Sequence, residues 1–186
     1  MDKGKSIDTS MGFTPLEGLI MGTRCGDLDP AIVFYLMDHK NLDARQINIL
    51  FNKQSGLLGL AGTGSSDLRD ILADGEKGNQ QAEIAIHAFV YRIKKYIGAY
   101  TAALGGLDAI VFTAGIGENS DLIREMVCAG LEGLGIILDP EKNARANRKS
   151  CQVHSDQSRV KIMVVPTNEE RAIALQTLQL LRTEGL

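Results

Sequence analysis

The sequence has few cysteines, and their spacing matches no disulfide or metal-binding pattern. Its three cysteines, Cys25, Cys128 and Cys151, are odd in number, far apart and without CxxC spacing. A disulfide framework needs paired cysteines and a zinc site needs closely spaced ligands, so neither is expected. The sequence therefore predicts reduced thiols.

The chain also lacks the signals of nucleic-acid-binding, secreted and membrane proteins. Its formal net charge of -3 over 186 residues gives no basic surface for DNA or RNA. The first residues, MDKGKSIDTS, are polar and lack the apolar segment of a signal peptide, and no apolar run is long enough to span a bilayer. We expect a cytoplasmic protein with no nucleic-acid or membrane partner.

The pattern of apolar residues indicates the fold class. A length of 186 residues suffices for one well-buried core, so the default is a single domain over residues 1–186. Helical periodicity comes first, with a buried stripe expected along residues 80–104, and strands then alternate with helices, which predicts an α/β chain with a largely parallel sheet toward its end. The expected helices cover residues 30–39, 43–55, 67–72, 80–104, 120–134 and 169–181, the strands 108–113, 136–138 and 160–165, and the loops 74–79 and 142–158.

One arginine lies in a turn of small neutral residues. The run DTSMGFTPLEGLIMGTRCGDLDP places Arg24 in a Gly/Thr-rich setting. A guanidinium presents several donors in a planar fork and stays charged, so a turn that holds it rigidly can bind the oxygens of a phosphoryl group in transfer. The alternative is a surface arginine paired with Asp27 or Asp29.

A second candidate segment, Gly115 to Asn119, joins the expected strand at 108–113 to a helix. Backbone N–H groups at such a junction favour an anionic ligand. One alternative is a plain turn with Asn119 as N-cap. Another is the dinucleotide fingerprint, which fits poorly because Ser120 replaces its third glycine and Asp139, directly before Pro140, reads as a turn or helix-start residue.

The glycine-rich segment at residues 59–70 lacks the lysine of a GxxxxGK[ST] loop, so it is not a phosphate-binding loop of that kind. From the residues alone, Ser66 and Asp67 are helix caps and Arg69 is an exposed helix residue.

Near the end of the chain, Thr167 and Glu170 have the spacing of a capping box, which leaves Glu169 without a structural task. A carboxylate at the mouth of a nucleotide cleft can hold Mg²⁺ through water; the alternative is a solvated first-turn glutamate. The scattered His39, His87 and His154 are assigned no chemistry.

Together these segments resemble the acetate and propionate kinase (acetokinase) family. The family's motifs occur in order: DTSMGFTPLEG followed by GTRxGD, then GTGSSDLRDI at residues 62–71, FTAGIGEN at 112–119 and PTNEE at 166–170. The resemblance covers essentially the whole chain as a carboxy-terminal half. It implies the actin-like ATPase (ribonuclease H-like) fold, here only its second, nucleotide-binding domain, with the amino-terminal domain absent.

The resemblance also implies roles for particular residues. It places Arg24 on the transferring phosphoryl group, where the neighbouring Cys25 stands at a position at which serine is common, and makes Glu169 the Mg²⁺ ligand. An acidic residue can hold a ribose hydroxyl or an exocyclic amine, and an arginine can lie against the purine. The implied contacts to ATP or ADP are Asp67, Leu68 and Arg69 in one segment and Gly115, Ile116, Gly117, Glu118 and Asn119 in the other.

The function implied by the resemblance is reversible transfer of the γ-phosphoryl group of ATP to acetate or propionate, which gives an acyl phosphate and ADP, in a homodimer. The family's other catalytic groups belong to the amino-terminal half, so this chain alone is expected to be inactive. The alternative is a catalytically silent nucleotide-binding and dimerisation module. The choice among acetate, propionate and butyrate stays open.

Overall fold

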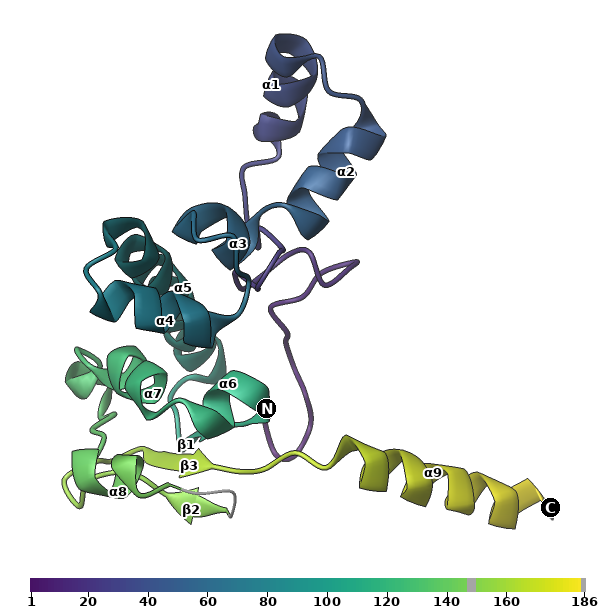
Figure 1. The fold of residues 1–186 in the computed structure, drawn as a ribbon. Helices are drawn as coiled ribbons and strands as arrows, with labels where there is room; N and C mark the ends of the chain where they lie inside the picture. The colour runs from purple at the N-terminus through teal and green to yellow at the C-terminus, as the bar shows by residue number, and fades with distance from the viewer. Residues whose placement is uncertain (147–149, 185–186) are drawn as a thin grey trace. The chain divides into compact units, whose positions relative to one another are not determined.

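The structure is a computed structural model, and it describes residues 1–146 and 150–184. Its contacts divide the chain into two compact units, Met1–Leu107 and Asp108–Leu186 (Figure 1).

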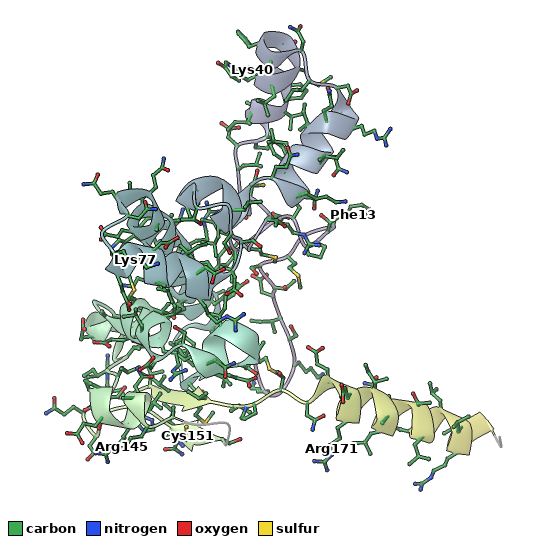
Figure 2. All side chains as sticks on the ribbon, in the orientation of Figure 1. Phe13, Lys40, Lys77, Arg145, Cys151 and Arg171 are labelled. Atoms are coloured by element: carbon green, nitrogen blue, oxygen red, sulfur yellow. The ribbon has the colours of Figure 1, made fainter. Side chains whose placement is uncertain are left out.

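The first unit is helical. Helices α3 and α4 pack on the long α5, which buries Ala82, Ala85, Ile86, Phe89 and Val90 on one face, so the predicted stripe is confirmed in the amino-terminal half of that helix. A long extended segment precedes α1, and Figure 2 shows Phe13 on it, pointing away from the helices with its side chain fully exposed. The helices are α1 (Ala31–Lys40), α2 (Ala44–Lys53), α3 (Gly56–Ala61), α4 (Leu68–Glu76) and α5 (Gln80–Leu104).

Side-chain caps fix where these helices begin. Asp43 accepts from the N–H of Gln46 and closes a capping box at α2, and Asn79 accepts from two N–H groups at the start of α5. Asp67 caps α4, as predicted. Helix α4 continues to Glu76, so the first half of the loop expected at 74–79 is a helix end.

The second unit has a three-stranded sheet in the order β1-β3-β2. Strands β1 and β3 are parallel, and the short β2 is antiparallel to β3. The core lies under α7, where Ile123, Val127, Ile136, Ile162 and Val164 are buried. The α/β class is therefore confirmed. The elements are β1 (Ala109–Phe112), α6 (Ala114–Asn119), α7 (Asp121–Cys128), the 3-10 helix Glu132–Leu134, α8 (Pro140–Ala144), β2 (Cys151–Gln152), β3 (Lys161–Val164) and α9 (Glu169–Glu184).

Four expectations for this unit are wrong. Residues 136–138 do not form a strand, because Ile137 gives its N–H to the hydroxyl of Ser158 and only an isolated bridge joins Leu138 to His154. The sheet is mixed rather than largely parallel, because β2 is antiparallel to β3. The loop expected at 142–158 contains the end of α8 and β2, and the helix expected over 120–134 ends at Cys128, where Gly130 has a φ of 76°.

Two other predictions are confirmed. Asp139 is the N-cap of α8, where it accepts from the N–H of Lys142. Within the described residues, Cys25, Cys128 and Cys151 form no disulfide. In the same part of the chain, no helix is both long enough and apolar enough to cross a membrane.

Candidate active site

The arginine turn, residues 21–25, is tied to the end of α2. The hydroxyl of Thr23 donates to the carbonyl of Asn52 at 2.9 Å, and the N–H of Cys25 donates to the carbonyl of Phe51 at 3.0 Å. These carbonyls lie in the last turn of a helix and have no partner inside it. The turn therefore supplies donors to the last carbonyls of α2, and these hydrogen bonds fix the turn in place.

Asp27 is not the partner of Arg24. Its carboxylate lies 2.6 Å from the guanidinium of Arg92 on α5, and it accepts from the hydroxyl of Tyr96 at 2.9 Å and from the N–H of Gly18 at 2.7 Å. Partial burial raises the pKa of Asp27, but the hydrogen bonds from Tyr96 and Arg92 outweigh it and hold that pKa below its ordinary value. The carboxylate of Asp27 is thus bound to side chains of α5 and does not pair with Arg24.

Asp29 is not the partner either, because its carboxylate accepts from the N–H of Ala31 at the start of α1. The guanidinium of Arg24 contacts the sulfur of Met21 at 3.7 Å, and it pairs with no carboxylate in residues 1–146 and 150–184. The alternative of a paired surface arginine is therefore wrong. A half-buried guanidinium without an acidic partner has its donors available for an anion.

Arg24 lines a cavity of about 780 Å³ in the first unit. The lining contains two cations, Arg24 and Lys53, and no acidic residue. Such a lining favours an anionic ligand. The other lining residues are Thr14, Leu16, Met21, Gly22, Thr23, Asn48, Asn52 and Ser66.

Helix α2 contributes polar residues to this cavity that were not predicted from the sequence. Asn48 and Asn52 are four residues apart on one helix face, and the amide of Asn52 donates to the side-chain oxygen of Asn48 at 2.9 Å. Lys53 follows directly. Two amides and a lysine at this spacing are a signal for a polar helix face, but only the fold brings that face to Arg24.

Asp67 and Arg69 form a closed pair at the start of α4. Asp67 accepts from the N–H of Arg69 at 2.9 Å and from its Nε at 3.0 Å. The side-chain hydrogen bond from Arg69 lowers the pKa of Asp67 to about 2. The Arg69 side chain is 88% exposed, whereas Leu68 is buried in the helical core and has only its backbone to offer a ligand.

We expect Arg69→Gln to raise the pKa of Asp67 from about 2 toward 3.8, although not fully, because the N–H of residue 69 still donates. Since the folded-state pKa lies below 3.8, the pair stabilises the folded chain above that pH and the contribution is lost as the pH falls toward about 2. Carboxyl NMR titration of Asp67 measures it, with Arg45→Gln as control. An unchanged Asp67 titration in Arg69→Gln would contradict the assignment.

In the second unit, Gly115 to Asn119 form the short helix α6 rather than a turn. The helix starts directly after β1, at Ala114, whose φ is 57°, and Ser120 rather than Asn119 caps the following helix, α7. Asn119 instead donates to the carbonyl of Gly115 at 2.7 Å. Strand β1 is therefore followed by a short helix that contains two glycines, and not by the predicted turn.

Glu118 links this segment to the PTNEE motif. Its carboxylate accepts from the N–H of Thr167 at 2.8 Å and from the hydroxyl of Thr167 at 3.1 Å. The backbone hydrogen bond lowers the pKa of Glu118. The two motifs of the second unit therefore meet, and Glu118 lies next to the residues that lead into α9.

The predicted capping box of Thr167 and Glu170 is wrong. Thr167 donates to Glu118, and the side-chain oxygen of Asn168 accepts from the N–H of Arg171 at the start of α9. Glu169 begins α9 with an exposed side chain. Its carboxylate has no hydrogen-bond or ion-pair partner among the residues that the structure describes, so it is available to a cation.

No group of three or more His, Cys, Asp or Glu side chains in the described residues could form a metal site.

A buried arginine that the sequence analysis missed supports α6. Arg124 on α7 is 1% exposed and donates to the carbonyls of Gly117 at 2.9 Å and Glu118 at 3.0 Å. It also donates to the side-chain oxygen of Asn143 at 2.7 Å and to the carbonyl of the same residue at 3.1 Å. Arg124 lies one residue after Ile123 and four before Cys128 on an amphipathic helix. This spacing places Arg124 near the buried face and could have identified it from the sequence.

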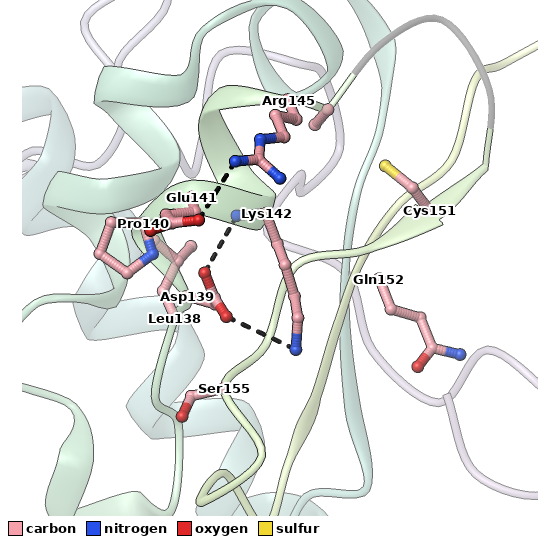
Figure 3. Close-up of a pocket in the computed structure, with 10 residues that line it drawn as sticks. Leu138, Asp139, Pro140, Glu141, Lys142, Arg145, Cys151, Gln152 and Ser155 are labelled. Atoms are coloured by element: carbon pink, nitrogen blue, oxygen red, sulfur yellow. Dashed lines mark hydrogen bonds and ion pairs between the residues drawn. The ribbon is translucent and has the colours of Figure 1, made fainter.

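Figure 3 shows a second cavity, of about 830 Å³, in the second unit. Its charged side chains pair with one another: Lys142 lies 3.5 Å from Asp139, and Arg145 lies 3.2 Å from Glu141. None of the predicted site residues lines it. We therefore take the Arg24 cavity as the candidate site of the first unit, and α6 with Glu169 as that of the second.

The chain is similar to known proteins over most of its length. The model of the Acetokinase family matches residues 1–175. Among curated relatives, the acetate kinase of Dictyoglomus thermophilum is 57% identical over 176 residues, which are 95% of this chain and 44% of the relative. The acetate kinase of Methanosarcina thermophila is 51% identical over 184 residues, 99% of this chain and 45% of the relative.

Solved structures give the same result. The chain matches Porphyromonas gingivalis acetate kinase with a TM-score of 0.91 at 47% identity, over 96% of this chain and 44% of that one. It matches a propionate kinase from Francisella tularensis with a TM-score of 0.83 at 44% identity, over 90% and 42%. The chain spans less than half the length of the relatives it matches. With a family model that covers residues 1–175 and with relatives more than 50% identical, the chain belongs to the acetokinase family.

Proposed function

We propose that this chain is the carboxy-terminal, nucleotide-binding part of an enzyme that transfers the γ-phosphoryl group of ATP reversibly to acetate or propionate, with acyl phosphate and ADP as products. The observation that carries the proposal is the guanidinium of Arg24, which pairs with no carboxylate of the described residues and lines a cavity without acidic lining residues. We also propose, from composition and family, that the protein acts in the cytoplasm.

The role of Arg24 follows from the charge of the reaction. Phosphoryl transfer leaves little covalent chemistry to the protein, so catalysis comes from positioning and from charge stabilisation. Arg24 binds the oxygens of the transferring group, where a rigid guanidinium gains most in the transition state.

The family resemblance implies nucleotide contacts within each unit taken separately. In the first unit, Asp67 can accept from a ribose hydroxyl or an exocyclic amine, and the exposed guanidinium of Arg69 can lie against a purine. In the second unit, the implied contacts are Gly115, Ile116, Gly117, Glu118 and Asn119 on α6. Arg124 and Thr167 hold that helix in place.

Glu169 fits a magnesium ligand, because its carboxylate is exposed and unpaired within the described residues. When bound, Mg²⁺ neutralises charge on the phosphate oxygens of ATP. Glu118 is less suited, because one of its oxygens already accepts two hydrogen bonds from Thr167.

The chain alone is expected to show no measurable acyl phosphate formation, because removal of even one preorganised catalytic group typically costs about 10² to 10³ in rate. Joining it to the amino-terminal part of a curated acetate kinase should restore turnover. Hydroxamate trapping measures both proteins. Turnover by the pure chain alone would contradict the half-site proposal, and an inactive but folded joined protein that still binds ATP would favour a silent module.

The second candidate function is a catalytically silent module that binds nucleotide and dimerises. Helix α1 favours dimerisation. The helix reads AIVFYLMDHK, yet it has no buried residue, and Phe34 and Tyr35 are 66% and 53% exposed. A helix that is apolar on all sides is normally covered. We propose that a second copy of the chain covers it.

A homodimer in solution is therefore expected. Light scattering of the chain at tens of micromolar should give twice the mass of 20.1 kDa, and Phe34→Asp should give a monomer, since it places a charge in the covered face. Ile84→Asp on α5 is the control, because Ile84 is also exposed, at 61%, but lies on another helix. A monomer without any substitution would contradict the proposal, as would a dimer in the Phe34→Asp variant.

A further inference from the structure

The backbone of the arginine turn occupies the space that a side chain at position 56 would need. Gly56 is the first residue of α3 and has a φ of 63°, in the left-handed region. A Cβ built on it would lie 2.2 Å from the carbonyl oxygen of Met21 and 2.7 Å from that of Arg24. It would also lie 2.9 Å from the nitrogen of Arg24. These atoms are backbone, so relief of the overlap requires the turn itself to move.

The turn cannot move independently of α3. The N–H groups of Leu57 and Leu58, which have no partner inside the helix, donate to the carbonyls of Met21 and Gly22 at 2.9 and 2.8 Å. Ser55 directly precedes α3, but its side chain makes no capping hydrogen bond to the helix, and its N–H donates to the carbonyl of Thr23 at 3.0 Å. The arginine turn is therefore the N-terminal cap of α3.

The opposite side of the turn is also fixed. Thr23 and Cys25 bond to the last carbonyls of α2, and a Cβ on Gly22 would lie 3.0 Å from the carbonyl oxygen of Ser66, in the segment that precedes α4. A side chain at position 56 would thus push a turn that is held on three sides. The displacement would pass to Arg24.

We infer that Gly56 is a positioning residue for the phosphoryl-binding arginine: the absence of a side chain at position 56 sets the place of the Arg24 backbone. The inference rests on the proposed function of Arg24. A shift of about 1 Å in a group that must meet a transition state can cost about 10² in rate. Neither the family motifs around Arg24 nor its immediate sequence includes Gly56, which lies on another element.

The test uses Gly56→Ala in the joined protein described above. We expect kcat to fall at least about tenfold while the KM for ATP changes less than about twofold, because the nucleotide segments are not displaced. The matched control is Gly78→Ala. Gly78 has a φ of 86°, and a Cβ there would meet no atom within 4 Å, so it carries the same backbone strain without the overlap. Equal kcat values for the two variants would overturn the inference.

A double-mutant cycle separates positioning from general damage. In the Arg24→Ala background, Gly56→Ala should lower kcat less than about twofold further, because the group it displaces is gone. A full additional tenfold loss would show that Gly56 acts through something other than Arg24. If Gly56→Ala does not fold, Thr23→Val, which removes the bond to the Asn52 carbonyl, replaces it in the same cycle.

The same cycle distinguishes a failure of the proposed Arg24 function from a failure of the inference about Gly56. Wild-type kcat in Arg24→Ala would contradict the proposed function of the arginine. A large loss in Arg24→Ala together with Gly56→Ala behaving like Gly78→Ala would leave that function intact and overturn only the role of Gly56.

Discussion

Arg24→Ala, introduced into this chain joined to the amino-terminal part of a curated acetate kinase, is expected to lower kcat at least about 100-fold. The affinity for ATP should stay nearly unchanged, because the charge that the guanidinium meets is largest in the transition state. Steady-state kinetics with hydroxamate detection gives kcat, and equilibrium titration gives the nucleotide affinity.

Arg45→Ala is the control for loss of a positive charge. Arg45 lies on α2, is exposed and does not line the Arg24 cavity, so its removal should leave kcat within about twofold. Asp67→Ala and Gly117→Val should show the opposite pattern, with weaker ATP binding first. Wild-type kcat in Arg24→Ala would place the phosphoryl-binding group elsewhere.

Arg124→Met is expected to lower the free energy of unfolding by about 3 kcal/mol, the largest stability effect we predict. Met keeps much of the volume but removes the donors for the carbonyls of Gly117, Glu118 and Asn143, and a buried acceptor without a partner costs about 1 to 3 kcal/mol. Because two of these carbonyls belong to α6, nucleotide binding should weaken as well. Urea unfolding followed by circular dichroism measures the stability.

The matched control is Arg145→Met, directly after the end of α8. The Arg145 side chain is 80% exposed and pairs with Glu141 on the surface, so its loss should cost no more than about 0.5 kcal/mol. Hydrogen exchange should then locate the Arg124→Met effect in α6 and α7. If both variants unfold at the same urea concentration, the buried network contributes little, and α6 owes its position to other contacts.

The sequence by itself determined the features that depend on neighbours a few residues away. The bounds of α5, the caps at Asp67 and Asn79 and the helix start at Asp139 all follow from hydrogen bonds between residues two or three positions apart. The four motifs, by their order, identified the family, which the comparisons confirm. The α/β class followed from the change of apolar period along the chain.

The same local reasoning failed where a partner distant in the sequence competed with the local one. Asn168 rather than Thr167 caps α9, since the N–H and hydroxyl of Thr167 are used 49 residues away by Glu118. Residues 136–138 are apolar enough for a strand, but the hydroxyl of Ser158 takes the N–H of Ile137, and the segment cannot join the sheet along its length. Sequence pattern does not show which of two suitable partners lies closer in the fold.

Only the tertiary structure decided how the candidate site is built. Asp27 stood three residues from Arg24 in the sequence, yet Arg92 and Tyr96, 65 and 69 residues away, bind it and leave Arg24 unpaired. Gly56 meets the arginine turn and Arg124 meets α6 for the same reason: their contacts join separate elements. Residue types set which interactions are possible at each position, whereas packing of helices against loops selects the ones that form, because each donor and acceptor can be satisfied only by a group that the fold brings within reach.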